Sequence, residues 1–135
     1  MIKGITHVAL RVSDIETSVD FYTNKLGLEE RFRLIDGNGD LMLVYIDAGP
    51  GQFIELFPGG ECSLSANPSC SVGPVHLCFE VDDIFCTYKE LTEAGVETRG
   101  EPILGADKSW QFWTMDPDKC PIEFHQFTPD SLQFK

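Results

Sequence analysis

Two of the three histidines in this 135-residue chain occupy matching places in two similar stretches of sequence. His7 stands in "GITHVALRVSDIET" and His76 in "GPVHLCFEVDDIFCT", 69 positions apart. Two glutamates repeat in the same way, because Glu55 in "FIELF" and Glu123 in "PIEFHQ" lie 68 positions apart. Imidazole and carboxylate ligands together suit Zn, Ni, Co or Fe better than Ca or Mg. The four residues therefore predict a divalent metal site.

Each glutamate of this set lies within an otherwise apolar run that is typical of a β-strand. Side chains alternate faces along a strand, so Glu55 shares a face with Phe53 and Phe57, and Glu123 shares a face with His125. An unpaired carboxylate in such surroundings costs several kcal/mol or changes its pKa. A single histidine or glutamate near a strand is more often structural than a ligand, and it is the matched repeat of all four residues that favours the metal.

The elements that would position these residues also occur twice, which is the first pattern to look for in a sequence. Each half reads as strand, helix and three further strands, with turn-forming residues between the apolar runs. The first helix is expected after Ser13 or Asp14 and the second after Asp82 or Asp83, and they end at Gly27 and Gly95. Strands are expected at 7–12, 29–35, 41–48 and 52–57 in the first half, and at 75–81, 96–104, 110–116 and 121–127 in the second.

This pattern predicts an α+β fold made of two tandem β-α-β-β-β modules. The length favours one domain over residues 1–135. Within it we expect a first module at about 1–58, a linker rich in Gly, Ser and Pro at about 59–73, and a second module at about 74–128.

The composition excludes several classes of function. A formal net charge of −12 disfavours binding to nucleic acid or to an anionic membrane surface. No apolar stretch approaches the roughly 20 residues that span a membrane. The first residues do not resemble a secretory signal, so we expect a cytoplasmic protein.

The cysteines are odd in number and form no C-x-x-C pair, which predicts free thiols. They are Cys62, Cys70, Cys78, Cys86 and Cys120.

Several other residues carry weaker signals. His125 could support the metal from a second layer or simply line a cleft, and we favour the second interpretation. The aromatic residues Trp110, Phe112 and Trp113 are expected in the core, as is usual for aromatic residues in a strand. The stretch "DGNGD" at 36–40 is typical of a hairpin turn and lacks the later positions of a calcium-binding loop.

Taken together, several stretches resemble the vicinal oxygen chelate superfamily, known for glyoxalase I. They are "HVALRV", "VDFYTNKLGL", "FIELF", "VHLCFEVDD" and "DPDKCPIEF", and the resemblance runs from Ile2 to Phe127. It implies a cupped mixed sheet around one divalent metal ion, held by His7, Glu55, His76 and Glu123. Bacterial glyoxalase I enzymes have the same order of ligands, which implies Ni or Zn as the cofactor and a homodimer with sites at the interface.

The resemblance also implies a reaction. A 2-oxoaldehyde joined to a thiol as a hemithioacetal would become a 2-hydroxyacyl thioester by proton transfer through a carboxylate. Glu123 is the expected base, and Glu55 its counterpart on the opposite face of the substrate. Arg11, four residues after His7, matches an arginine of the family and would bind a carboxylate of the small-molecule substrate.

Two other functions stay open at this point. An epimerase or isomerase of the same fold would act on an acyl-CoA or a sugar-derived carbonyl compound, although epimerases for methylmalonyl-CoA usually have glutamine in place of Glu55. A protein of the bleomycin-resistance kind would bind a small molecule without chemistry. Glyoxalases tend to have an asparagine shortly after the first glutamate and "DPDG" near the end, whereas this chain has "ELFPGG" and "DPDK". The identity of the thiol therefore stays open.

Overall fold

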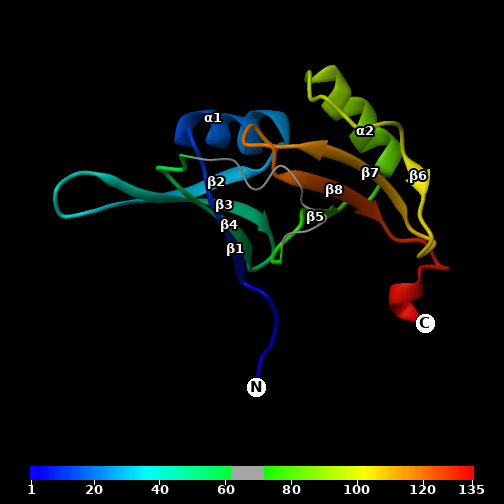
Figure 1. Ribbon diagram of the computed structural model, residues 1–135. Coiled ribbons are helices and arrows are strands. Elements are labelled where there is room, and N and C mark those ends of the chain that lie inside the picture. Colours follow the sequence, from blue (N-terminus) through cyan, green and yellow to red (C-terminus); the bar gives the residue numbers. More distant parts are fainter. Residues whose placement is uncertain (62–71) are drawn as a thin grey trace. The chain divides into compact units, whose positions relative to one another are not determined.

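The structure is a computed structural model that describes residues 1–61 and 72–135 (Figure 1). Contacts within the chain divide it into two compact units, Met1–Ser63 and Leu64–Lys135. Most of the predicted linker, with Cys62 and Cys70, lies outside the described residues. Each unit contains one of the two sequence repeats. The prediction that both form a single domain stays a prediction.

The first unit is a four-stranded mixed sheet with one helical segment. Its sheet has the order β1-β4-β3-β2, in which β1 is parallel to β4 and the other pairs are antiparallel. The core includes Tyr22, Ile54 and Leu56, which are almost fully buried. The elements are β1 (His7–Arg11), α1 (Ile15–Asp20), a π-helical turn (Phe21–Lys25), β2 (Glu29–Ile35), β3 (Leu41–Gly49) and β4 (Gln52–Phe57).

Helix α1 begins where one of its two candidate caps stands. The Asp14 side chain accepts a hydrogen bond from the Thr17 amide at 2.7 Å, so Asp14 rather than Ser13 caps the helix. The second half of the expected helix is π-helical, with the Leu26 amide bonded to the Phe21 carbonyl. Gly27 then adopts a φ of 76°, as expected for a glycine that ends a helix.

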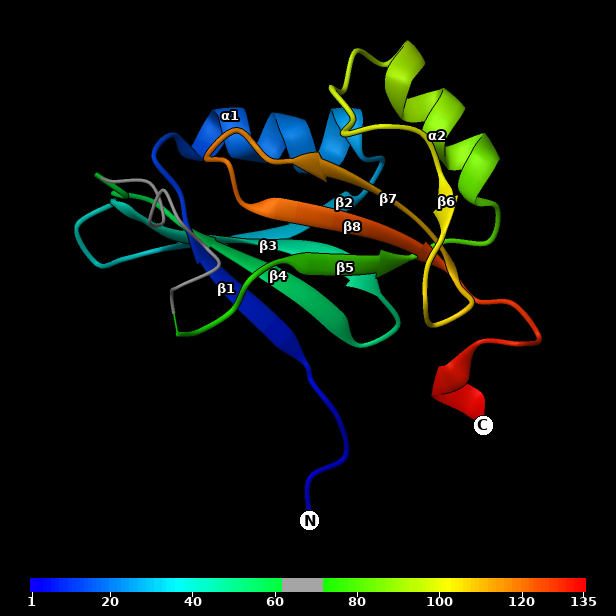
Figure 2. The same ribbon diagram turned by 45° about the vertical axis from the view of Figure 1, so that its right-hand side comes forward.

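The second unit repeats this arrangement. Its sheet has the order β5-β8-β7-β6, with β5 parallel to β8. Helix α2 contacts β7 and β8 and buries Ile84 and Leu91 (Figure 2). The Asp83 side chain accepts hydrogen bonds from two amides at the start of α2, so it is the cap. The elements are β5 (Leu77–Glu80), α2 (Ile84–Glu93), β6 (Ile103–Leu104), β7 (Trp110–Met115), β8 (Pro121–Gln126) and a short 3-10 helix (Leu132–Phe134).

The strand predicted at 96–104 is much shorter in the structure. Only Ile103–Leu104 forms β6, and before it Thr98 makes an isolated bridge to Thr114. Gly100 has a φ of 82° and Pro102 has no amide hydrogen, so the chain cannot continue the ladder through this stretch.

The predicted fold class is confirmed. The described residues form two four-stranded mixed sheets and two α-helices in tandem β-α-β-β-β order, which is an α+β fold. The stretch at 36–40 is a hairpin turn, as expected, in which Asp36 accepts hydrogen bonds from the Asn38 and Asp40 amides. None of the described helices is long and apolar enough to cross a membrane.

Candidate metal centre

In the first unit, the parallel pairing of β1 with β4 brings His7 and Glu55 together. Nε2 of His7 lies 3.4 Å from Oε2 of Glu55. The Glu55 side chain is 12% exposed and the imidazole 44% exposed, so the carboxylate lies deep and the ring faces outward. Ile54 and Leu56 point to the opposite face and are buried in the core, as the alternation predicts.

A residue that sequence reasoning missed completes this first pair. Tyr45 lies opposite Glu55 in the register of β3 and β4 and donates its phenolic hydrogen to the Glu55 carboxylate. That hydrogen bond, followed by loss of hydration and the negative charge of Glu55, raises the pKa of Tyr45 above its ordinary value. Alternation places Tyr45 on a face of β3, but only the register shows what lies across from it.

The second unit forms an equivalent pair. Nε2 of His76 lies 3.2 Å from Oε2 of Glu123, and the Glu123 side chain is 11% exposed. Trp113, opposite Glu123 in the register of β7 and β8, sets its ring edge to face against His76 at a centroid distance of 4.8 Å. Phe112 is in the core as expected. Trp110 and Trp113 are only half-buried, so the expectation of a core position is wrong for both, and Trp113 belongs to the site face.

The donor atoms of each pair suit a shared cation. Ligand atoms bound to one ion at about 2.0–2.2 Å, at octahedral to tetrahedral angles, lie roughly 3.0–3.5 Å apart. The separations of 3.4 Å in the His7–Glu55 pair and 3.2 Å in the His76–Glu123 pair fall in that range. Imidazole nitrogens combined with carboxylate oxygens suit a divalent ion of intermediate hardness, such as zinc or nickel. The four predicted ligands form two pairs, His7 with Glu55 in the first unit and His76 with Glu123 in the second.

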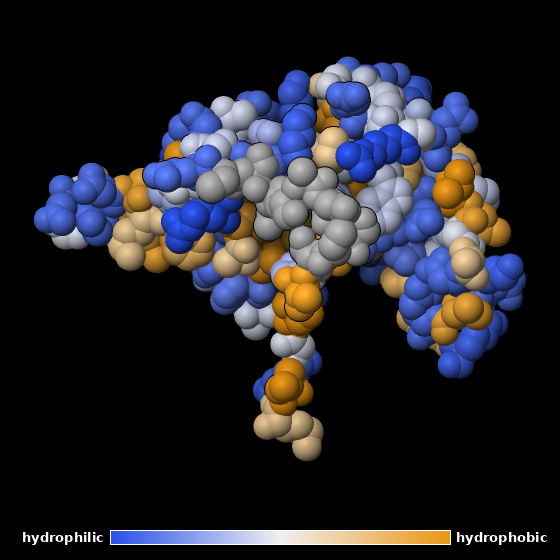
Figure 3. Space-filling view, in the orientation of Figure 1, coloured by the Kyte–Doolittle hydropathy of each residue, from blue (hydrophilic) through white to orange (hydrophobic). Residues whose placement is uncertain are grey.

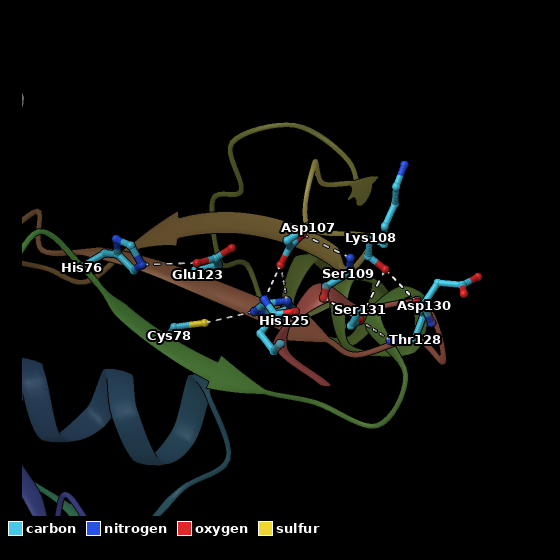
Figure 4. A network of polar contacts seen from close by, with 11 residues as sticks. His76, Cys78, Asp107, Lys108, Ser109, Glu123, His125, Thr128, Asp130 and Ser131 are labelled. Atoms are coloured by element: carbon cyan, nitrogen blue, oxygen red, sulfur yellow. Dashed lines mark hydrogen bonds and ion pairs between the residues drawn. The ribbon is translucent and has the colours of Figure 1, made fainter. Parts of the chain in front are cut away.

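More polar groups continue this face of the second sheet (Figure 4). Sγ of Cys78 lies 3.8 Å from Nδ1 of His125, and Nε2 of His125 lies 3.3 Å from Oδ2 of Asp107. Cys78 is exposed as a residue, but partial loss of hydration around its sulfur, followed by the charge of the nearby Glu123 carboxylate, raises the pKa of Cys78 to about 12, so the thiol carries its proton at neutral pH. His125 was considered in the sequence, but Cys78 and Asp107 were not linked to it because they come from separate segments.

The predicted substrate-binding residue, Arg11, lies on the exposed face of β1 that also carries His7. Its Nη1 donates a hydrogen bond to the Pro58 carbonyl at 2.9 Å, and its guanidinium carbon lies 5.7 Å from the centre of the Phe57 ring. These contacts hold the positive charge at the end of β1. The predicted free thiols are confirmed for the three described cysteines, Cys78, Cys86 and Cys120.

Comparison with known proteins places this fold in a family. Residues 4–124 match the model of the Glyoxalase/Bleomycin resistance protein/Dioxygenase superfamily. The chain belongs to this superfamily. Members of the superfamily typically bind a divalent metal ion, bind small molecules and are commonly dimeric. The resemblance to the vicinal oxygen chelate fold is thereby confirmed.

Similar proteins in the superfamily have two different activities in their names. The chain is 35% identical over 114 residues to the ethylmalonyl-CoA/methylmalonyl-CoA epimerase of Cereibacter sphaeroides, covering 78% of this chain and 83% of the relative. It is 28% identical over 128 residues to a probable lactoylglutathione lyase of Vibrio parahaemolyticus, covering 90% and 89%. A solved glyoxalase family protein from Enterococcus faecalis superposes with a TM-score of 0.76 at 28% identity, covering 91% of this chain and 97% of that one.

Proposed function

We propose that this protein is a metal-dependent enzyme of the glyoxalase I type. It would convert the hemithioacetal of a 2-oxoaldehyde and a thiol into a 2-hydroxyacyl thioester. The observation that carries the proposal is the repeat of one imidazole and one carboxylate at equivalent positions of the two sheets, at 3.4 Å and 3.2 Å. A reaction that moves a proton between adjacent carbons can use a carboxylate on either face of the substrate.

In this proposal, His7, Glu55, His76 and Glu123 hold the metal, with Ni or Zn as the expected ion. When bound, the ion would stabilise the negative charge that develops on the substrate oxygens. Glu123 removes the proton from the carbon that carries the sulfur and returns it to the adjacent carbonyl carbon. The hydroxyl of the first carbon loses its proton and becomes the thioester carbonyl, while the old carbonyl oxygen gains a proton.

The surroundings of the two carboxylates support different roles for them. Glu55 already accepts a hydrogen bond from Tyr45, which holds the carboxylate in place. At the equivalent position opposite Glu123 stands Trp113, whose ring contacts His76 instead. Because Glu123 lacks a phenolic donor at that register position, it is the better candidate for the principal base. Glu55 then serves as the counterpart carboxylate.

Arg11 would bind the carboxylate of the substrate. Its guanidinium has five donor hydrogens, of which the structure shows one bonded to the Pro58 carbonyl. Within residues 1–61 and 72–135 the other donors make no hydrogen bond, so they could form a bidentate contact with a carboxylate, and the charge lies on the same strand face as His7. The chain has 22 acidic and 10 basic residues, so such a cation would matter for an anionic substrate.

A second candidate is an epimerase of an acyl-CoA, in which the same carboxylates exchange a proton on one carbon. The similarity to the ethylmalonyl-CoA/methylmalonyl-CoA epimerase favours it. Two observations favour a small thiol as the substrate partner instead of CoA. The net charge of −12 would repel the phosphate groups of CoA, and position 55 carries a glutamate, where these epimerases usually have glutamine.

We also propose that the protein works as a homodimer with its sites at the interface. The N-terminal segment before β1 exposes apolar side chains that a second copy would cover (Figure 3). They are Met1, Ile2 and Ile5.

The proposal is tested with protein stripped of metal and reloaded with Ni or Zn. Thioester formation from methylglyoxal and glutathione is followed, and in parallel the exchange of the α-hydrogen of methylmalonyl-CoA with deuterated water. Metal-dependent thioester formation that is lost in Glu123→Gln, while metal binding is retained, supports the glyoxalase reaction. Exchange on the CoA ester without thioester formation supports the epimerase. A Glu123→Gln variant as active as the parent would contradict the assigned base.

A further inference from the structure

Cys78 and His125 lie beside the His76–Glu123 pair on the same face of the second sheet (Figure 4). Cys78 lies opposite Glu123 in the parallel register of β5 and β8, and His125 follows two positions later on the same face. One ligand atom from each of Cys78, Glu123 and His125 lies within 4.8 Å of the other two. Thiolate, imidazole and carboxylate are the three groups that zinc binds in proteins.

The separation of sulfur and nitrogen is close to what one ion requires. Sγ of Cys78 and Nδ1 of His125 are 3.8 Å apart. On a tetrahedral zinc, with Zn–S of about 2.3 Å and Zn–N of about 2.0–2.1 Å, the two atoms are roughly 3.5 Å apart. A movement of a few tenths of an ångström would therefore let both atoms bind one cation.

Asp107 supplies the support that a metal-binding histidine usually has. Its Oδ2 lies 3.3 Å from Nε2 of His125, which is buried and makes no aligned hydrogen bond. The negative charge of Asp107 favours the tautomer with the proton on Nε2, which leaves the lone pair of Nδ1 directed at Cys78. Gln133 donates to Oδ2 of Asp107 at 2.6 Å, and the Ser109 amide donates to Oδ1 at 3.2 Å. The carboxylate is therefore held in place.

The first module shows that the fold itself does not need this cluster. Ala9 occupies the position equivalent to Cys78, because it lies opposite Glu55 in the register of β1 and β4. Phe57, two residues after Glu55, occupies the position equivalent to His125. Neither side chain can bind a metal ion, and the first sheet forms without one. The thiol and imidazole are additions specific to the second module.

We propose that Cys78, Glu123 and His125 form a second metal site, which binds zinc or another thiophilic divalent cation. The Cys78 thiol releases its proton to the solvent when the ion binds, and the resulting thiolate, Nδ1 of His125 and one carboxylate oxygen of Glu123 are the ligands. Glu123 is shared between the two sites, because its Oε2 lies beside His76 and a carboxylate has a second oxygen. The site shares Glu123 with the proposed reaction, but Cys78 and His125 have no part in that reaction, so their binding of a metal ion is tested separately from it.

The test is a titration of the metal-free, reduced protein with Co²⁺, which gives a charge-transfer absorption band when a thiolate binds it. We expect two cobalt ions per chain and one thiolate band. Cys78→Ser should lose the band and one of the two ions, whereas Cys86→Ser and Cys120→Ser should keep both. A His7→Ala variant should also keep the band, because that residue is a ligand of the other site only.

These outcomes separate the new site from the proposed function. A band that persists in a chain without the four-ligand centre supports the new site even if no thioester forms. Absence of the band, or a band that Cys78→Ser leaves unchanged, would overturn the inference. A single ion whose band is lost in both Cys78→Ser and His7→Ala would also overturn it, because Cys78 would then be a ligand of the first centre.

A measurement on the unaltered protein covers the case in which Cys78→Ser does not fold. The thiols are alkylated at pH 8 with and without zinc, for long enough that Cys78 of the zinc-free protein reacts, and each site is quantified by mass spectrometry. Zinc should slow the modification of Cys78 at least tenfold and leave Cys86 on α2 unaffected. Equal protection of both cysteines, or none at Cys78, would contradict the site.

Discussion

Tyr45 donates its phenolic hydrogen to Glu55, whereas Trp113, at the equivalent position of the other sheet, turns its ring toward His76. Each aromatic residue lies opposite the glutamate of its own module in an antiparallel strand pair. Both rings lie edge to face against the histidine of their module, at centroid distances of 6.4 Å for Tyr45 and 4.8 Å for Trp113, and Tyr45 alone adds a hydrogen bond to the carboxylate opposite it.

Replacing Tyr45 with phenylalanine removes the hydrogen bond to Glu55 and keeps the ring. We expect metal affinity to fall by about 10- to 100-fold, as for other groups that orient a metal ligand. Competition with a chelator measures the change. Tyr88→Phe is the matched control, because Tyr88 packs on Phe112 away from the pair. Equal affinities in the two variants would show that Tyr45 does not orient a metal ligand.

Loading the protein with its metal should raise the free energy of unfolding. A ligand that binds only the folded state at 100 times its dissociation constant adds about 2.7 kcal/mol. Thermal unfolding with excess nickel or zinc, against the same protein in chelator, measures the gain. The gain should shrink in the double variant His7→Ala, His76→Ala. An unchanged melting temperature on loading would argue against a metal centre.

Arg11→Gln should raise the KM for an anionic substrate and leave kcat nearly unchanged. A charge-assisted hydrogen bond is worth about 1.5–3 kcal/mol, which corresponds to about tenfold or more in KM. Arg31→Gln is the control, because Arg31 pairs with Asp47 at 3.4 Å on the surface. If Arg11→Gln lowers only the stability, the contact with the Pro58 carbonyl is its main role.

Asp83→Ala removes the cap of α2 and should lower the free energy of unfolding by about 1 kcal/mol. Both amides that Asp83 accepts from, those of Phe85 and Cys86, would lose their side-chain partner. Asp82→Ala is the matched control, with an expected change within about 0.5 kcal/mol. Urea unfolding measures both, and equal losses would contradict the assignment of Asp83 as the cap.

Stability should fall with acid partly through Arg33, which binds both Glu16 and Glu30. Its hydrogen bond holds the pKa of Glu30 below the ordinary value of 4.5. The contribution is therefore present above pH 4.5 and is lost as the pH falls through the lowered pKa.

At neutral pH, Arg33→Gln should cost roughly 1 kcal/mol or less, and the difference from the parent should shrink as the pH falls below 4.5. Urea unfolding across that range measures it. Lys89→Gln, which removes an exposed pair with Glu93 at 3.8 Å, should change little at any pH. If Arg33→Gln lowers the free energy of unfolding equally at low and at neutral pH, the loss does not come from the ion pairs of Arg33 with Glu16 and Glu30.

Local pattern alone was sufficient to predict much of this structure. The two-residue period of a strand needs no tertiary information, so alternation places each glutamate on one face of its own strand and its neighbours on the other. The neighbours of Glu55 and Glu123 are in the core, as expected: Ile54, Leu56, Ile122 and Phe124. The boundaries of β2 and β4 agree with the apolar runs because turn-forming residues limit both strands. The sequence did not decide whether Asp82 or Asp83 caps α2, because the choice depends on the backbone dihedral angles of the two residues.

The sequence by itself determined the repeat, the fold class and the residue types of the four candidate ligands. Only the tertiary structure decided what each ligand touches. Residues 48 positions apart, His7 and Glu55, come within 3.4 Å because β1 and β4 pair in parallel, and register is a property of two strands together. The same pairing in the second module sets Cys78 against Glu123, and the loop before β7 brings Asp107 to His125. No periodicity within one segment encodes such contacts, because they depend on how separate segments pack.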